Sequence, residues 1–271
     1  MISDCCQKIS PFIVMEILER AKQLEQQGDH IIHLEIGEPD FETPQRIIDA
    51  AKESLDRGDT HYTHSLGILP LREAIARYYS VNYRVSVSPQ QVVVTSGTSP
   101  ALLLVLSILL NSGDNFIGAN PSYACYKNFL TYLNARFKCV NVYQEDGFQY
   151  DPDQIRQNID SRTKAIMINS PSNHTGTLLS ADKMKAIAAL DKLVISDEIY
   201  HGLVYGERAH SILEFTSNAI VLNGFSKLFA MTGWRLGYLI APLELIRPIQ
   251  KLQQNLFICA NSFVQWGVWR L

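Results

Sequence analysis

The sequence carries no strong excess of charge of either sign, and this argues against nucleic acid as a partner. Lysine and arginine together number 24 and aspartate and glutamate 27, which leaves a formal net charge of −3 over 271 residues. No run of basic residues offsets this balance, so the positive patch typical of a nucleic-acid-binding protein is missing. We therefore expect no nucleic-acid partner.

Long apolar runs are also missing. The longest one, Ala101 to Leu110, contains a serine and is too short to span a bilayer. The first residues, MISDCCQKIS, lack the basic region and following apolar stretch of a secretory signal. We expect no membrane partner and no secretion.

Cysteine is scarce, and its spacing excludes two further kinds of site. The five cysteines are odd in number and include no CxxC pair, so they indicate neither a disulfide framework nor a zinc site. The patterns HExxH, GxGxxG and GxxxxGK[ST] are absent as well. Reduced thiols without a secretory signal predict a cytoplasmic protein, and we expect no metal.

What the sequence does contain is an alternation of helix-like and strand-like segments. Helical spacing of apolar residues predicts helices at 11–27, 44–57 and 69–83, and IIHLEIGEPDF suggests a short strand followed by a turn. Short apolar runs predict further strands at 92–95, 116–118, 137–142, 165–168, 193–195 and 219–222. Strands separated by helices indicate an α/β fold: three layers, α/β/α, around a mainly parallel sheet.

Polar residues follow five of these predicted strands. Ligands of open α/β sheets bind beyond the carboxyl ends of the strands, so these residues are the candidates for a site. They are TSGT at 95–98, NPSY at 120–123, NSPSNHTG at 169–176, SDEIY at 196–200 and NGFSK at 223–227. The pattern predicts one site along one edge of the sheet.

The residue types at this edge suit pyridoxal phosphate. That cofactor needs a lysine for its aldehyde, an acid beside its pyridine nitrogen and a flat ring partner, and Lys227, Asp197 and Tyr123 offer these. A helix that begins after Gly97, together with Arg235, suits the phosphate.

Each residue also has an ordinary interpretation. The alternatives are helix or turn caps for the SGT segment and Asp197, a turn asparagine for Asn173, core packing for Tyr123 and a surface position for Lys227. Any one of these alternatives is reasonable by itself. The combination, in this order and at strand ends, favours the cofactor.

The sequence resembles the class I/II aminotransferases, which are fold-type I pyridoxal-phosphate enzymes. The resemblance covers about Ile36 to Ala241 and depends on GEPDF at 37–41, YTHSLGILPLREAIA at 62–76, NSPSNHTG at 169–176, SDEIY at 196–200 and FSKLFAMTGWRLGY at 225–238. It implies a large cofactor-binding domain at 46–271 and the N-terminal part of a small domain at 1–45. It also implies a homodimer that moves an amino group between an amino acid and a 2-oxo acid.

The same resemblance implies individual roles. Lys227 would form the Schiff base with the cofactor, Asp197 would pair with the pyridine nitrogen, and Tyr200 would be the third catalytic residue. The implied cofactor-binding residues are Ser96, Gly97, Thr98, Tyr123, Asn173, Asp197, Tyr200, Ser226, Lys227 and Arg235, with Tyr62 reaching the phosphate of the other subunit. Gly37 and Asn173 would line the substrate.

The sequence departs from the family pattern in three places. His174 stands where the family usually has proline, which predicts a trans peptide bond after Asn173, and Gly224 stands where many members have serine. Family members usually continue through the rest of the small domain, which supplies an arginine for the substrate carboxylate, so we expect exposed apolar surface before Gln45. A C–S β-lyase on the same scaffold, or a shortened chain that binds cofactor with little activity, remain alternatives.

Overall fold

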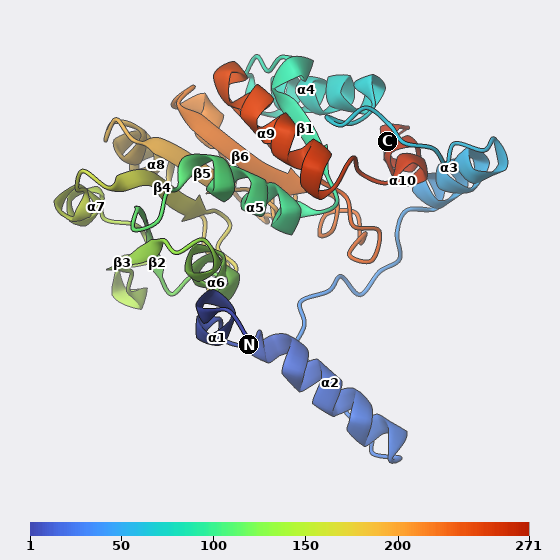
Figure 1. The fold of residues 1–271 in the computed structure, drawn as a ribbon, viewed down its shortest axis with the longest axis horizontal. Helices are drawn as coiled ribbons and strands as arrows, with labels where there is room; N and C mark the ends of the chain where they lie inside the picture. Colours follow the sequence, from blue (N-terminus) through green and yellow to red (C-terminus); the bar gives the residue numbers. More distant parts are fainter. Residues whose placement is uncertain (271) are drawn as a thin grey trace.

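A single mixed sheet forms the centre of the fold. Within residues 1–270, which the computed structural model describes, seven strands lie in the order β1-β7-β6-β5-β4-β2-β3 (Figure 1). Their bounds are β1 Val92–Thr95, β2 Asn115–Asn120, β3 Arg136–Asn141, β4 Thr163–Asn169, β5 Leu193–Asp197, β6 Ala219–Gly224 and β7 Gly237–Ile240. All neighbouring pairs are parallel except those of β7, which runs antiparallel to β1 and β6. Leu271, the last residue of the predicted large domain, lies outside the described residues.

Successive strand residues point to opposite sides of the sheet, so each strand contributes to two hydrophobic cores. In β6, Ile220 and Leu222 belong to one hydrophobic core, whereas Ala219 and Val221 belong to the other. Helices cover both faces, so the predicted three-layer α/β/α architecture is confirmed (Figure 1).

The helices divide between these two faces. On the face of Ile220 and Leu222 lie α5 Thr98–Leu109, α6 Ala124–Tyr132 and α9 Leu243–Leu256. On the other lie α4 Leu69–Tyr83, α7 Pro152–Asn158, α8 Ala181–Ala188 and α10 Ser262–Trp269, with α3 Gln45–Asp56 packed against α10. Within residues 1–270, none of these helices has the length and apolar character needed to cross a membrane.

The predicted elements agree with the structure except at one place, and several further elements were not predicted. The strand suggested within IIHLEIGEPDF is wrong, since residues 29–44 contain no strand. The side chains of Ile32 and Leu34 there are 77% and 89% exposed, and no neighbouring strand pairs with the segment. The sequence pattern did not predict β7, which is only four residues long and begins at the end of the glycine-rich motif at 225–238, nor the helices at 4–8, 243–256 and 262–269.

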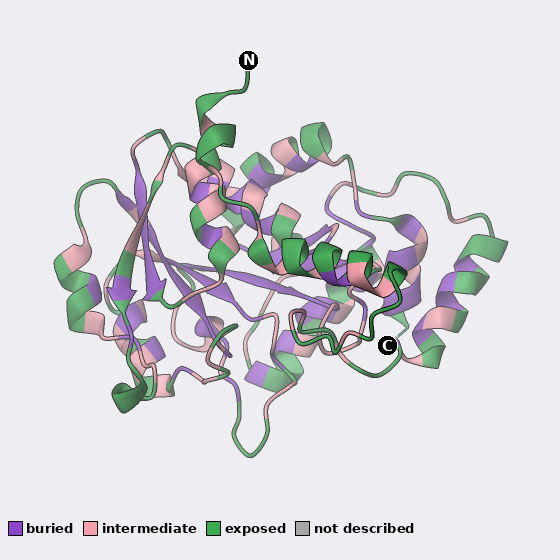
Figure 2. Ribbon diagram, turned by 90° about the horizontal axis from the view of Figure 1, so that it is seen from below, coloured by how far each residue is buried: buried purple, intermediate pink, exposed green. Residues whose placement is uncertain are grey.

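The first 44 residues lie largely outside the sheet and its helices. Helix α1, Asp4–Lys8, contacts α6, and α2, Ile13–Gln26, extends away from the sheet before an extended segment leads to α3 (Figure 1). Figure 2 shows most of the strands buried and much of α2 exposed. Ile13 and Ile17 of α2 are 60% and 49% exposed. The expected exposed apolar surface is therefore present. A domain boundary at residue 45 stays a prediction.

Candidate active site

The predicted site residues gather at the carboxyl ends of the parallel strands. Asn169 in β4 lies opposite Asp197 in β5, and Asp197 lies opposite Leu222 in β6. Lys227 follows β6 in the bend that leads to β7, and Gly97 follows β1. The sheet thus brings together segments that are far apart in the sequence.

Asp197 is a buried acid between β5 and α6. Its Oδ2 accepts a 2.6 Å hydrogen bond from the Tyr126 hydroxyl, and its Oδ1 accepts a 3.2 Å bond from the Ile199 N–H. Burial raises the pKa of Asp197, and the Tyr126 hydrogen bond opposes that rise. Within residues 1–270 no lysine or arginine forms an ion pair with it, so a cationic ligand atom would offset the cost of burying its charge.

Tyr200 and Asn173 form a second polar group beside Asp197. The Asn173 Nδ2 donates a 2.7 Å hydrogen bond to the Tyr200 hydroxyl. Asn169 holds this loop, because its Oδ1 accepts from the Asn173 N–H at 2.7 Å and its Nδ2 donates to the Asp197 carbonyl at 3.0 Å. The cis peptide bonds among the described residues precede Pro121 and Pro171, so the predicted trans bond after Asn173 is confirmed.

Lys227 is a half-buried amine in the bend between β6 and β7. Its Nζ donates a 2.7 Å hydrogen bond to the Gly37 carbonyl. Desolvation lowers the pKa of Lys227, with Glu38 opposing the shift and Arg235 adding to it. A lowered pKa increases the fraction of neutral, nucleophilic amine.

The segment before α3 also holds the bend that carries Lys227. The Thr43 hydroxyl donates to the Ala230 carbonyl at 2.7 Å and accepts from the Trp234 Nε1 at 3.1 Å. Together with the Gly37 contact, these bonds join residues 37–43 to both ends of the bend. An extended segment that pairs with no strand is thereby tied to the candidate site.

The start of α5 and Arg235 form a cradle suited to an anion. Gly97 caps α5 with a φ of +98°, a conformation that favours glycine, and a Cβ there would lie 2.6 Å from the Arg235 Nη2. Ser96, Thr98 and Ser226 are half-buried at the same strand ends. Backbone N–H groups at a helix N-terminus together with a guanidinium are a typical phosphate site.

Gly224 has a packing reason of its own. A Cβ at this position would lie 3.0 Å from the Gly237 Cα and 3.1 Å from the Leu236 carbonyl oxygen. The close approach of β6 and β7 therefore favours glycine where many family members have serine.

Two predicted cofactor-binding residues, Tyr123 and Tyr62, form no hydrogen bond with the other predicted site residues in the described part of the chain. The Tyr123 ring meets Tyr126 edge-on, with centroids 5.3 Å apart, and meets Phe12 at 6.0 Å. Tyr62 is 81% exposed, and within residues 1–270 its hydroxyl makes no hydrogen bond into the site.

Three residues that support the site do not stand out in the sequence pattern. Asn169 and Thr43 anchor loops, and Tyr126 contacts Asp197 directly. A signal for Tyr126 was present, because it lies three positions after Tyr123, a spacing that places two side chains on one helix face. The partner of Tyr126 could not be read from this spacing.

The residues present fit pyridoxal phosphate. A buried acid without an ion-pair partner suits a protonated pyridine nitrogen, and the Gly97–Arg235 cradle suits a phosphate. No group of three or more histidine, cysteine, aspartate or glutamate side chains within residues 1–270 is arranged to hold a metal ion.

Comparisons with known proteins agree with this assignment. The family described as Aminotransferase class I and II matches residues 29–268. A (5-formylfuran-3-yl)methyl phosphate transaminase of Methanocaldococcus jannaschii is 43% identical over 270 residues, which cover 98% of this chain and 71% of that protein. A probable aspartate aminotransferase of the same organism is 37% identical, with 98% and 72% covered.

Solved structures show the same relationship. The Thermus thermophilus aspartate aminotransferase with maleate superposes with a TM-score of 0.96 at 32% identity, covering 99% of this chain and 72% of that one. A Methanococcus jannaschii protein, described as similar to kynurenine aminotransferases in its active site, gives a TM-score of 0.90 at 42% identity, with 100% and 72% covered. The chain belongs to the class I and II aminotransferases. It is a pyridoxal-phosphate-dependent transferase of amino groups.

Proposed function

We propose that Lys227 bonds covalently to the aldehyde of pyridoxal phosphate and that the enzyme moves an amino group between an amino acid and a 2-oxo acid. The observation that carries this proposal is that a half-buried amine and a buried acid lie at the ends of neighbouring strands. Lys227 follows β6, Asp197 ends β5, and these strands are adjacent and parallel. Desolvation changes the pKa of both groups.

Bound pyridoxal phosphate supplies an aldehyde for the amino group and a ring that accepts the electron pair left when a substrate proton is removed. Asp197, when ionised, keeps the ring nitrogen protonated. The Lys227 amine, when free, would accept the proton removed from the substrate carbon and return it to another carbon. Arginine could not replace this lysine, because its guanidinium stays protonated.

The other residues position the reacting groups. Tyr200 and Asn173, joined by their hydrogen bond, would contact the ring hydroxyl oxygen. The phosphate would lie between the start of α5 and Arg235, as the close approach of Gly97 to Arg235 supports. Gly37 would line the substrate with Asn173, and the contact of its carbonyl with Lys227 supports this role.

We further propose a homodimer in which Tyr62 completes the phosphate site of the neighbouring subunit. Its high exposure supports a role outside its own chain. Closed two-fold dimers are the commonest oligomers, so one such contact per subunit would create two equal sites. A cytoplasmic location is part of the same proposal, supported by five free cysteines.

The test follows both products of the reaction. The purified protein, loaded with cofactor, is incubated with aspartate, alanine, glutamate or an aromatic amino acid, and with 2-oxoglutarate or, for glutamate, with oxaloacetate. Aminotransfer yields a new 2-oxo acid and a new amino acid in equal amounts, whereas a β-lyase acting on cysteine-like substrates releases a thiol, ammonia and pyruvate without an acceptor. Lyase products alone, or a cofactor absorption band without turnover of any pair, would contradict the proposal.

A further inference from the structure

Glu198 is a fully buried acid next to Asp197, on the opposite side of the end of β5. Asp197 contacts Tyr126 of α6, whereas Glu198 contacts Tyr79 of α4. The sheet separates these helices, so the two neighbouring carboxyl groups face its two sides. The family motif SDEIY contains Glu198, but the proposed mechanism assigns it no role.

Several donors converge on Glu198. Its Oε1 accepts from the Ser196 hydroxyl, the Ser211 hydroxyl and the Ile212 N–H, each at 3.0 Å. Its Oε2 accepts from the Tyr79 hydroxyl at 3.4 Å. These donors favour the ionised form of the Glu198 carboxyl and so oppose the effect of burial, which favours the protonated form.

The nearest titratable nitrogen does not neutralise this acid. His201 Nδ1 lies 3.5 Å from Glu198 Oε2, but burial lowers the pKa of His201 to about 4. The His201 Nε2 lies 3.0 Å from the Ser170 carbonyl, so it carries the proton, and Nδ1 accepts from the Tyr83 hydroxyl at 2.7 Å. His201 is therefore neutral at neutral pH.

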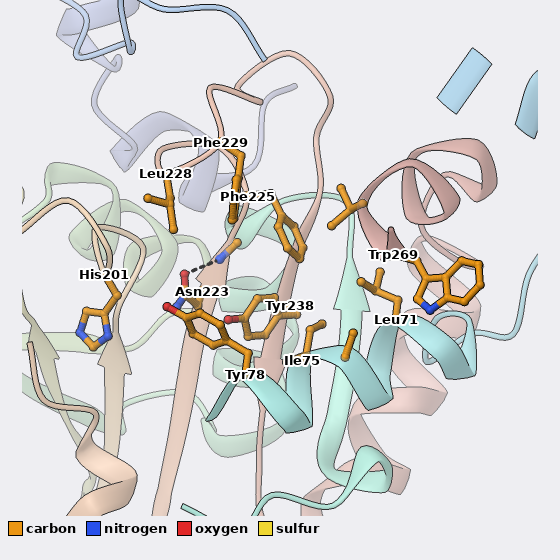
Figure 3. Close-up of a pocket in the computed structure, with 13 residues that line it drawn as sticks. Leu71, Ile75, Tyr78, His201, Asn223, Phe225, Leu228, Phe229, Tyr238 and Trp269 are labelled. Carbon is orange, nitrogen blue, oxygen red and sulfur yellow. Dashed lines mark hydrogen bonds between the residues drawn. The ribbon is translucent and has the colours of Figure 1, made fainter. Parts of the chain in front are cut away.

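A cavity adjoins this polar cluster on the α4 side. It has a volume of about 160 Å³ and is bounded in part by His201, Asn223 and Tyr238, with Leu228 and Phe229 from the bend after Lys227 (Figure 3). The Asn223 Nδ2 donates to the Tyr79 hydroxyl at 3.4 Å. The hydrogen-bonded cluster around Glu198 therefore extends to β6, the strand that precedes Lys227.

Burial raises the pKa of Glu198 to about 7, and the hydrogen bonds from Ile212, Ser196, Ser211 and Tyr79 limit that rise. Its negative charge in turn adds to the rise in the pKa of Asp197. The titratable groups that face Glu198 or its partner His201 are Asp197, Tyr79, Tyr83, Tyr238, His210 and Glu214. None of these is a lysine or an arginine.

We propose that Glu198 is a positioning residue that acts through Asp197, with two effects. Its hydrogen bonds hold the turn from Asp197 to Tyr200 against Ser211 and α4. Its buried negative charge adds to that of Asp197 in favouring the protonated form of the bound cofactor. The proposal rests on the proposed function, in which Asp197 pairs with the ring nitrogen.

The experiment compares wild type with Glu198→Gln, loaded with pyridoxal phosphate. Glutamine keeps an oxygen acceptor for the three donors but removes the charge. The pH midpoint of the cofactor's visible absorption band is expected to fall by about one pH unit, because a nearby buried negative charge no longer stabilises the protonated form. A merely structural role would leave this midpoint unchanged in any variant that still binds cofactor.

Two further variants make the result decisive. Glu214→Gln is the matched control, because it removes a carboxylate from the same region while keeping an acceptor for the Ser211 N–H, and its midpoint is expected to equal that of wild type. Ser211→Ala removes one donor to Glu198 and should shift the midpoint in the same direction by a smaller amount. This variant tests the proposal if Glu198→Gln does not fold. An absent absorption band in wild type would overturn the proposed function, whereas a normal band with one common midpoint would overturn only the role of Glu198.

Discussion

The Nζ of Lys227 donates a 2.7 Å hydrogen bond to the carbonyl oxygen of Gly37, which lies 190 positions earlier in the chain. A lysine in the bend after β6 is therefore held by a segment that belongs to no helix or strand. Thr43 holds the same bend through Ala230 and Trp234. The segment that joins α2 to α3 is thus part of the candidate site.

Lys227→Ala should abolish covalent binding of the cofactor and lower the rate of aminotransfer by at least about 10²–10⁴-fold, the usual contribution of a positioned acid–base group. Borohydride reduction followed by peptide mapping should label Lys227 in wild type. Lys251→Ala, a change at an exposed lysine, is the control and should keep both the label and the rate. A label on any other lysine of the wild type would contradict the assignment.

Gly97→Ala should weaken the binding of pyridoxal phosphate by about tenfold or more, corresponding to roughly 1.4 kcal/mol, because its Cβ would press on Arg235. Gly28→Ala is a close control. Its φ is +99° against +98° for Gly97, but a Cβ there meets nothing within 4 Å. Both variants should lose about 1–3 kcal/mol of stability because alanine rarely adopts a positive φ, and only Gly97→Ala should lose affinity. Equal dissociation constants of Gly97→Ala and wild type for pyridoxal phosphate, measured by fluorescence titration, would contradict a phosphate site at Gly97 and Arg235.

Tyr126→Phe should destabilise the protein by about 1–3 kcal/mol, because it leaves the buried Asp197 Oδ2 without its donor. It should also raise the pKa of Asp197 and weaken cofactor binding, since less of the acid is ionised. Urea unfolding and a cofactor titration measure the two effects. Tyr132→Phe, at a tyrosine that is 49% exposed, should change neither by much. Unchanged stability in Tyr126→Phe would show that the bond to Asp197 is unimportant.

Glu198→Gln should change how stability depends on pH. In the folded protein burial raises the pKa of Glu198 above its ordinary value of 4.5 to about 7. The resulting stabilisation of the folded protein is therefore complete below pH 4.5 and is lost as pH rises through 7. Glutamine has no such loss. The free energy of unfolding of the variant, relative to wild type, should therefore increase by roughly 3 kcal/mol between these pH values.

Urea unfolding of the cofactor-free proteins at several pH values measures this difference. The contribution of His201 has the opposite sign, because its lowered pKa gives stability above pH 6.5 that is lost as pH falls through about 4. It is expected in both proteins and cancels in the comparison. A difference that stays flat with pH would show that Glu198 titrates normally.

Mixing two inactive variants tests the proposed dimer. If Tyr62 serves the neighbouring subunit, a dimer of one Lys227→Ala chain and one Tyr62→Ala chain contains one site with both residues intact. Random mixing should then restore activity at about a quarter of the wild-type sites, since half of the dimers are mixed. The double variant in one chain, mixed with either single variant, is the control and should restore nothing. Activity that does not recover on mixing would place Tyr62 in its own subunit's site or outside both.

The sequence by itself determined the layers of this protein and the position of its site. Alternating strands and helices indicated the parallel sheet, because side-chain periodicity is a local property. Polar residues after Val94, Ile168, Ile195 and Leu222 predicted the edge where the site lies, because parallel strands end at the same edge. These features need only the order of residues along the chain.

Only the tertiary structure decided which groups support the site. Tyr126 donates to Asp197 across 71 positions, and Glu198 accepts from Tyr79 across 119. Such contacts, and the antiparallel pairing of β7 with β1 and β6, depend on how distant segments pack. The same packing buries Asp197 and Glu198 on opposite sides of the sheet and so raises the pKa of both. Burial, unlike periodicity, is a property of the whole fold.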